Sequence, residues 1–313
     1  MSVLTAPEAP VAPPRGGLLG AVRRHPIVSF FVLANLASWI AWIPYILSLH
    51  GLGVWDFHYP GGPIGGQLLG VLPGAYLGPI GSALLVTAIA DGRAGVRTWA
   101  RRLWRWKVGW RWYVGILLGV PLAMVLSALV FSGGQLHVPS AALLAALVPG
   151  LLAQMVTTGL AEEPGWRDFA LPRVQRLLGA PKAAVVIGAL WGLWHMPLYL
   201  TEWGGWPDVS WYRPIEFVLF CITFNVLMTW VFNRTGQSLP MAMLLHVSIN
   251  NFASIVWAET FPTLDVDVFQ HSLLLAATVA AVLTLVGSRG RLGYVPELEE
   301  PVARPVHEAA RLS

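Results

Sequence analysis

Two adjacent carboxylates, two histidines and an asparagine interrupt long apolar stretches of this chain. Glu162 and Glu163 stand in GLAEEPGWRDF, His195 stands in LWGLWHMPLYL, and His246 is followed four residues later by Asn250. Side chains four apart on a helix share one face. Ionisable groups in membrane-length apolar segments are costly unless they are paired, hydrated or used. Their joint presence therefore indicates a functional site.

These side chains have the chemistry to hydrolyse an amide or an ester. A carboxylate can take a proton from water, a nearby histidine can orient or share that proton, and His with Asn can donate to a developing oxyanion. The same atoms suit zinc, because Glu162, His195 and His246 would leave a position open for water. The residues leave both schemes open, with either no cofactor or one zinc.

Simpler explanations exist for each residue alone. A single histidine in a membrane helix can be a hydrogen-bonded packing residue, and Glu163 with Arg167 can be a local ion pair of little energetic consequence. The joint occurrence of these groups favours function over packing.

The composition indicates that the scaffold is a membrane protein, because 56% of the residues are hydrophobic and only 12% are charged. Several windows reach the ~20 apolar residues that cross a bilayer. We predict an all-α integral membrane fold of about eight transmembrane helices. They are expected at roughly residues 27–47, 67–90, 112–133, 141–162, 183–200, 214–232, 238–257 and 269–287.

The basic residues predict the orientation. On the eight-helix map, all of the 20 Lys and Arg except Arg213 fall on one side of the membrane. By the positive-inside rule both termini are expected to be cytoplasmic in a multi-pass cell-membrane protein. The net charge of +4 is then a topological signal, and the Trp/Arg-rich residues 99–112 are interpreted as an interfacial segment against lipid headgroups rather than a nucleic-acid site.

The chain divides into one domain and two tails. We expect disordered tails at 1–25 and 291–313, a single transmembrane domain at 26–290, and no cleaved signal peptide, because the first apolar run is too long for one. The one cysteine, Cys221, excludes an intramolecular disulfide and is interpreted as packing.

Three motifs resemble the CPBP family of intramembrane proteases, which includes CAAX proteases and bacteriocin-processing enzymes and is also called the Abi family. EEPGWR resembles its E-E-x-x-x-R motif, WGLWH its aromatic-x-x-x-His motif, and HVSIN its H-x-x-x-N motif. They occur in the family's order within a core of about residues 141–257. Trp191 departs from the family's usual Phe, and Pro164 from a position that is often not proline.

The resemblance implies an endopeptidase similar to type II CAAX prenyl endopeptidases, with an active site sunk in the membrane and open to the cytoplasm. Carried over residue by residue, Glu162 and His195 would activate water, His246 and Asn250 would form an oxyanion hole, and Glu163 and Arg167 would support them. Trp191 would contact the substrate. Membrane lipids and a peptide or lipidated protein are the implied partners, and of the two schemes we favour the metal-free, glutamate-dependent one.

Two other classes of function remain open. The chain could be a non-catalytic membrane immunity or interaction protein, or an ion-coupled transporter that uses Glu, His and Asn as a proton path. The helix map also holds an inconsistency, because it places Glu162 at the membrane edge but His195 about 20 Å along its helix.

Overall fold

The structure is a computed structural model that describes residues 17–295, and this part of the chain is helical, without a strand. Seven of its helical segments are long and apolar enough to cross a membrane: Pro26–Leu47, Gly62–Ala90, Trp110–Phe131, Ala141–Leu178, Ala180–Leu200, Arg213–Arg234 and Val266–Gly287. The predicted segment at 238–257 is also a helix, Leu239–Ile255, but it is shorter. The prediction of an all-α, multi-pass membrane protein is therefore confirmed, while the number of spans stays a prediction.

Four of the seven long segments are single helices, α2 (Pro26–Leu47), α7 (Trp110–Phe131), α12 (Arg213–Arg234) and α15 (Val266–Gly287), and the shorter apolar helix is α13 (Leu239–Ile255). The second segment comprises α3 (Gly62–Gly66), the π turn η1 (Gln67–Val71), α4 (Leu72–Ala75), the π turn η2 (Tyr76–Ile80) and α5 (Gly81–Ala90). The fourth comprises α8 (Ala141–Gln154), the π turn η4 (Met155–Gly159), α9 (Leu160–Glu163), the π turn η5 (Pro164–Ala170) and α10 (Leu171–Leu178). The fifth is α11 (Ala180–Trp194) followed by the 3₁₀ turn η6 (Met196–Leu200), and the connections hold α1 (Leu18–Arg24), α6 (Gly92–Arg101), η3 (Arg102–Trp104) and α14 (Trp257–Thr260).

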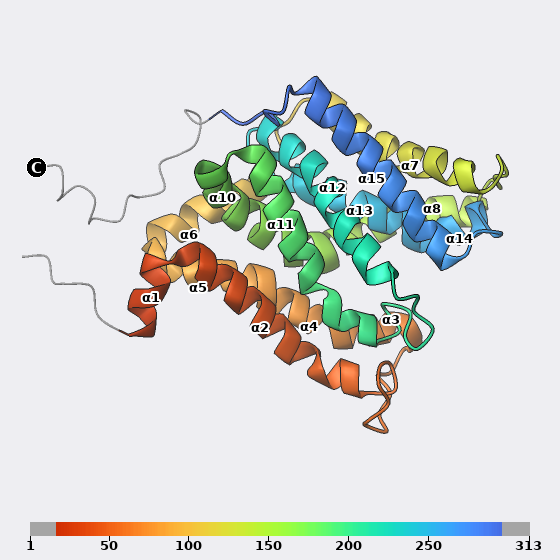
Figure 1. The fold of residues 1–313 in the computed structure, drawn as a ribbon, viewed down its shortest axis with the longest axis horizontal. Coiled ribbons are helices and arrows are strands. Elements are labelled where there is room, and N and C mark those ends of the chain that lie inside the picture. Colours follow the sequence, from red (N-terminus) through yellow and green to blue (C-terminus); the bar gives the residue numbers. More distant parts are fainter. Residues whose placement is uncertain (1–16, 296–313) are drawn as a thin grey trace, which may run out of the picture.

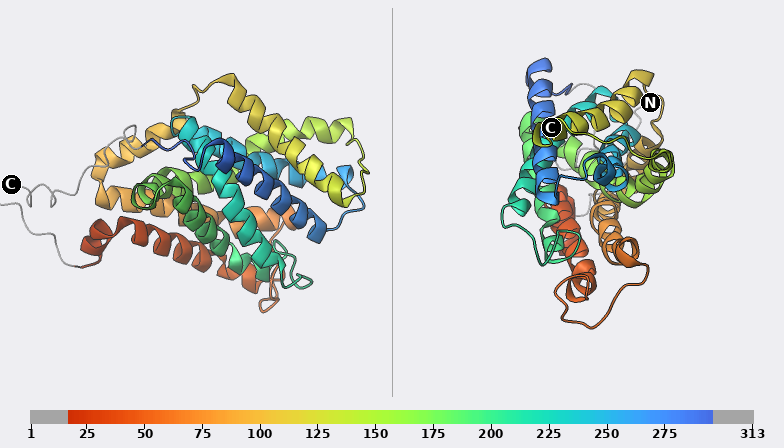
Figure 2. Two further views of the ribbon diagram at one scale, coloured as in Figure 1. Left: turned by 45° about the horizontal axis from the view of Figure 1, so that its top comes forward. Right: turned by 90° about the vertical axis from the view of Figure 1, so that its right-hand side faces the viewer.

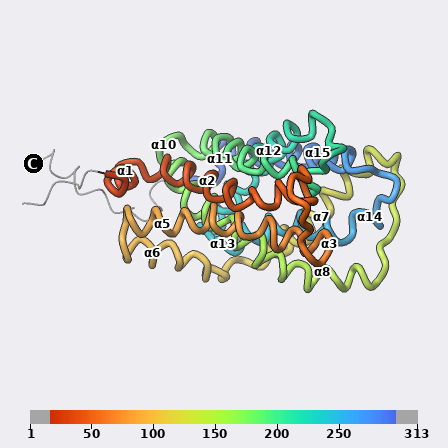
Figure 3. The backbone as a smooth tube through the Cα atoms, turned by 90° about the horizontal axis from the view of Figure 1, so that it is seen from below, coloured from red at the N-terminus to blue at the C-terminus, as the bar shows by residue number. Residues whose placement is uncertain are grey.

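The helices pack in groups around α13. α2 lies along the Gly62–Ala90 segment at one side of the bundle, while α11, α12 and α15 form a row (Figures 1 and 2). α13 contacts α7, α8 and η4, and therefore lies between the other elements (Figure 3). Its residues from Leu239 to Ile249 are all buried, whereas α2, α7 and α15 expose Val, Leu and Ile side chains along their outer faces. An apolar outer surface of this extent is what a lipid environment requires.

The predicted end of the fourth helix, at residue 162, is wrong. The helix runs from Ala141 to Leu178, so that Glu162 lies inside it rather than at a membrane edge. At ~1.5 Å per residue, Glu162 is about 24 Å from Leu178, and His195 is about 22 Å from Ala180 at the neighbouring start of α11. The inconsistency in the depths of these two residues is thereby removed.

Contacts from a distant segment support the π turn η5. A π turn leaves backbone carbonyls without their usual intrahelical partners. The Trp99 indole donates to the carbonyl of Pro164 (3.1 Å), and the buried guanidinium of Arg102 donates to both the carbonyl and the carboxylate of Asp168. Part of the predicted interfacial segment is therefore buried beneath the helix that carries the two glutamates, while Trp104 and Trp110 are exposed.

Glycines allow the Gly62–Ala90 segment to lie close against α2. They recur at every fourth position on the face that packs against α2 and the loop after it: Gly66, Gly70, Gly74 and Gly78. A Cβ atom at Gly70 would overlap the Tyr45 ring, and one at Gly74 would overlap the Trp42 indole. Close approach lets Trp42 donate to the Val71 carbonyl across the two helices (2.7 Å). The glycines therefore position the wall of the bundle that carries η1.

The predicted tails lie mostly outside the described residues. Within the described part, Leu18–Arg24 forms the short helix α1, where we had expected disorder, and Leu292 packs with Ala180 and Val226. Both described ends of the chain lie at the same end of the bundle as α6 and α10, opposite α3 and α14 (Figure 1).

Candidate active site

Adjacent glutamates in α9 have different surroundings. Glu162 is 6% exposed and lines a cavity, whereas Glu163 is completely buried behind it. Neighbouring residues on a helix point about 100° apart, so the two carboxylates cannot share one face. Because Glu162 alone borders the open space, it alone can meet a molecule that enters the cavity.

Trp191 holds both Glu162 and His195. Its indole N–H donates to Glu162 Oε2 (2.8 Å), and its carbonyl accepts from His195 Nδ1 (2.8 Å). A carbonyl can only accept, so Nδ1 carries the hydrogen and Nε2 of a neutral His195 keeps its lone pair. The His195 ring stacks on Trp203, with centroids 5.5 Å apart, which fixes the plane of the imidazole.

The second histidine belongs to a buried ionic chain. His246 Nδ1 lies 2.7 Å from Glu163 Oε1, and Glu163 Oε2 lies 3.2 Å from Nε of the fully buried Arg167. The Arg167 guanidinium also lies over the Trp191 ring, 5.0 Å from its centroid. Because Glu163 accepts the hydrogen of Nδ1, the His246 ring can carry a second proton on Nε2 and donate it. Glu163 and Arg167 do not line the cavity; they orient His246 from behind.

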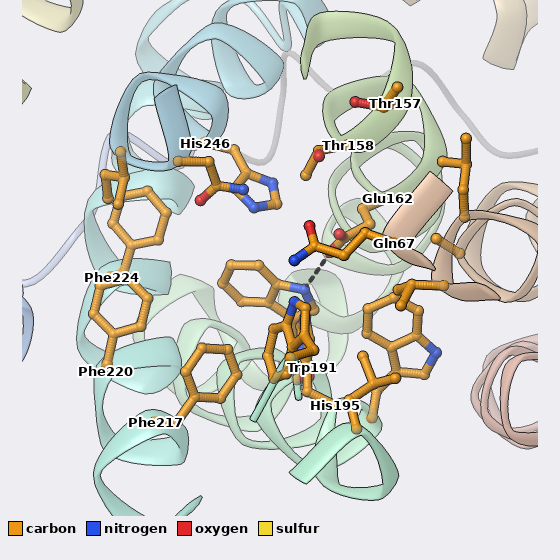
Figure 4. A pocket seen from close by; sticks show the side chains of 18 of the residues that line it. Gln67, Thr157, Thr158, Glu162, Trp191, His195, Phe217, Phe220, Phe224 and His246 are labelled. Atoms are coloured by element: carbon orange, nitrogen blue, oxygen red, sulfur yellow. Dashed lines mark hydrogen bonds between the residues drawn. The ribbon is translucent and has the colours of Figure 1, made fainter. Parts of the chain in front are cut away.

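The cavity has a volume of about 200 Å³ and brings the predicted water-activating and oxyanion-binding residues together (Figure 4). Glu162, His195, His246 and Asn250 all line it, with Trp191 in its wall. Asn250 follows His246 by one helical turn, and its carboxamide makes no hydrogen bond to the described residues. A carboxylate, an imidazole acceptor and two possible donors thus surround one space.

Sequence reasoning missed other cavity residues. Gln67 points into the space from η1 and Thr157 and Thr158 border it from η4 (Figure 4). An aromatic wall comes mainly from α12: Trp203, Phe217, Phe220 and Phe224. Gln67 could have been identified as a polar residue in a predicted span, whereas the phenylalanines look like ordinary membrane residues until they are placed in space.

The predicted zinc ligands do not form a metal site in this arrangement. Among residues 17–295, no three His, Cys, Asp or Glu side chains are placed where they could hold one ion. Glu162, His195 and His246 share a cavity, and because both histidines use Nδ1 in other hydrogen bonds, only Nε2 of each ring is left to bind an ion.

Residues 144–252 match the family described as "Type II CAAX prenyl endopeptidase Rce1-like". The CPBP resemblance is confirmed. A CAAX prenyl protease 2 of Methanococcus maripaludis is 25% identical over 174 residues, which cover 54% of this chain and 60% of that protein. All seven predicted site residues lie within the matched residues 144–252, whereas Gln67, Trp99 and Arg102 lie before them. The chain thus spans less than two thirds of the length of this relative.

Proposed function

We propose that this chain is an intramembrane endopeptidase that cleaves a peptide bond in a membrane-associated substrate. The observation that carries the proposal is the convergence of Glu162, His195, His246 and Asn250 on one cavity. Hydrolysis requires a base and oxyanion donors around one reacting carbonyl, and these residues supply both within a single space.

The proposed reaction begins with water beside Glu162. Oε1 of Glu162 accepts a proton as the water oxygen attacks the scissile carbonyl carbon, while His195 Nε2 orients the water. The carbonyl oxygen becomes an oxyanion that accepts hydrogen bonds from His246 Nε2 and Asn250 Nδ2. When the C–N bond breaks, the leaving amine takes the proton from Glu162, and the carboxylate is regenerated.

The cavity walls favour a substrate that is partly apolar. The aromatic side chains of α12 can contact an apolar side chain or lipid, and Gln67 can hydrogen-bond to a peptide backbone. The M. maripaludis relative is a CAAX prenyl protease by name, so a C-terminal CAAX sequence with a prenyl group is the first substrate to test.

Glu162→Gln tests the base directly. We expect roughly a 100- to 10,000-fold fall in kcat, because an amide cannot accept the proton of water. The fold should persist, since the amide oxygen can still accept from Trp191. The assay is cleavage of a fluorogenic farnesylated CAAX peptide by reconstituted protein, with its unprenylated form in parallel. Asp56→Asn, an exposed carboxylate away from the cavity, is the control, and full activity of Glu162→Gln would refute the mechanism.

Chelation tests the metal-free scheme. We expect cleavage to continue in a strong chelator and the purified protein to hold less than stoichiometric zinc, because the proposed base and oxyanion donors are all protein side chains. Elemental analysis and activity would be measured on the same preparation. One zinc per active chain, lost together with activity in His246→Ala, would overturn this expectation.

A further inference from the structure

A second hollow lies apart from the proposed active site. It has a volume of about 650 Å³ and is formed by the C-terminal ends of α12 and α15 and by the turn that follows α15. Its principal lining residues are Trp230, Arg234, Thr284, Gly287, Arg291 and Tyr294. The described end of the chain, at Val295, also borders this hollow.

The hollow carries an excess of positive charge. Arg234 and Arg291 both line it and are exposed, and none of the described lining residues is acidic. Each helix C-terminus contributes roughly half a negative charge, so the ends of α12 and α15 together offset about one of the two positive charges. After this offset, the two arginines leave the hollow with a net charge of about +1, which can attract an anion.

The surface beside the hollow is apolar. Leu283 lines the hollow and is 67% exposed, and Val286 on the same outer part of α15 is 72% exposed. Trp230 and Tyr294 are half-buried in its wall, and such aromatic side chains are typical of the level where headgroups meet hydrocarbon. The occupant therefore needs an anionic group for the arginines and an apolar chain for α15.

We propose that this hollow binds one anionic glycerophospholipid, with its phosphate between Arg234 and Arg291 and an acyl chain along Leu283 and Val286. The ends of α12 and α15 that form the hollow lie at the end of the bundle that carries α6 and α10 (Figure 1), and both of these helices contain arginines. The lipid attaches α12, which provides the aromatic wall of the active-site cavity, to the outer helix α15 and to the turn after it.

Native mass spectrometry of delipidated full-length protein tests this site. Titration with phosphatidylglycerol should show one binding event tighter than all later ones, and titration with phosphatidylcholine should show none. Arg234→Gln with Arg291→Gln should weaken the first event by roughly 10- to 30-fold, because each arginine near a phosphate contributes about one factor of five. Arg289→Gln, in the same turn but outside the hollow, should leave binding unchanged.

Gly287→Leu separates a shaped site from diffuse charge. A Cβ atom at Gly287 meets nothing within 4 Å, so a larger side chain can start there, and a leucine would occupy part of the hollow while both arginines are retained. We expect this variant to lose the tight phosphatidylglycerol event while its melting temperature stays within a few degrees of wild type.

Three results would overturn the proposal. Equal binding of phosphatidylglycerol and phosphatidylcholine by the wild type is the first, and unchanged binding in Gly287→Leu is the second. The third concerns the acidic residues that follow in the sequence, Glu297, Glu299 and Glu300. If they occupied the hollow instead, a chain ending at Val295 would bind phosphatidylglycerol tightly and the full-length chain would not.

Discussion

At the scale of single residues, Trp191 contacts four groups of the site through different atoms. Its indole N–H holds Glu162, its carbonyl holds His195, its ring face meets Arg167, and its edge-on ring lies 5.1 Å from that of His246. We predicted Trp191 as a substrate contact. In the structure Trp191 also has a positioning role, because it bonds to Glu162 and His195, the two groups proposed to activate water.

Trp191→Phe tests that positioning effect. Phenylalanine retains an aromatic ring and the backbone carbonyl but lacks the N–H that holds Glu162. We expect kcat to fall by roughly 10- to 100-fold, as for the loss of a hydrogen bond to a charged group, with little change in KM. Trp203→Phe is the matched control, because Trp203 stacks on His195 without bonding to Glu162. Equal kinetic effects of the two substitutions would show that ring packing alone matters.

The types of the site residues could be predicted from the sequence, but which of them contact one another across the bundle could not. Spacing within helices placed His246 with Asn250 and Trp191 with His195. It could not show that Glu163 pairs with His246, a contact that joins residues 83 positions apart. Nor could it show that Gln67 reaches the same cavity, because that depends on how two distant helices pack.

At the scale of elements, the glycine-rich face of the Gly62–Ala90 segment predicts a sharp dependence on side-chain size. Gly70→Ala should destabilise the protein by about 1–3 kcal/mol, because the added methyl group overlaps the Tyr45 ring. Gly115→Ala in α7 is the control, since a Cβ atom there meets nothing within 4 Å. Thermal unfolding of both variants in detergent is the measurement, and equal melting temperatures would contradict the packing argument.

The positions of most helices could be predicted from apolar run length, to within a few residues. The fourth helix was the exception, because Pro164 and Gly165 usually mark the end of a helix. Here the Pro164 carbonyl accepts from Trp99, and Gly165 lies where a Cβ atom would overlap Pro79. These tertiary contacts stabilise a continuation that local sequence disfavours, which is why the prediction failed there.

At the scale of the whole molecule, the fold separates the connecting segments by charge. The basic segments around α6 and α10 lie at one end of the bundle, and the loops around α3 and α14 lie at the other (Figure 1). This arrangement agrees with the charge separation on the predicted helix map. The side of the membrane that each end faces remains a prediction.

Reporter fusions test that orientation. Fusions after residues 105 and 235 should behave as cytoplasmic and fusions after residues 60 and 205 as external, because basic loops are retained on the inner side. Alkaline phosphatase and green fluorescent protein give opposite signals at each position, so each reporter is the control for the other. The reverse pattern would direct the basic end outward and exclude a cytoplasmic substrate.

The π turns on either side of Glu162 have a consequence for insertions and deletions. A π turn holds about one more residue than an α turn between the same flanking turns. One residue could therefore be lost from Met155–Gly159 with Glu162 still directed at the cavity, whereas the same loss between Leu160 and Glu162 would turn the carboxylate by about 100°. Related chains of different length are thus expected to align with this one through single-residue gaps inside the π turns, and without gaps between them.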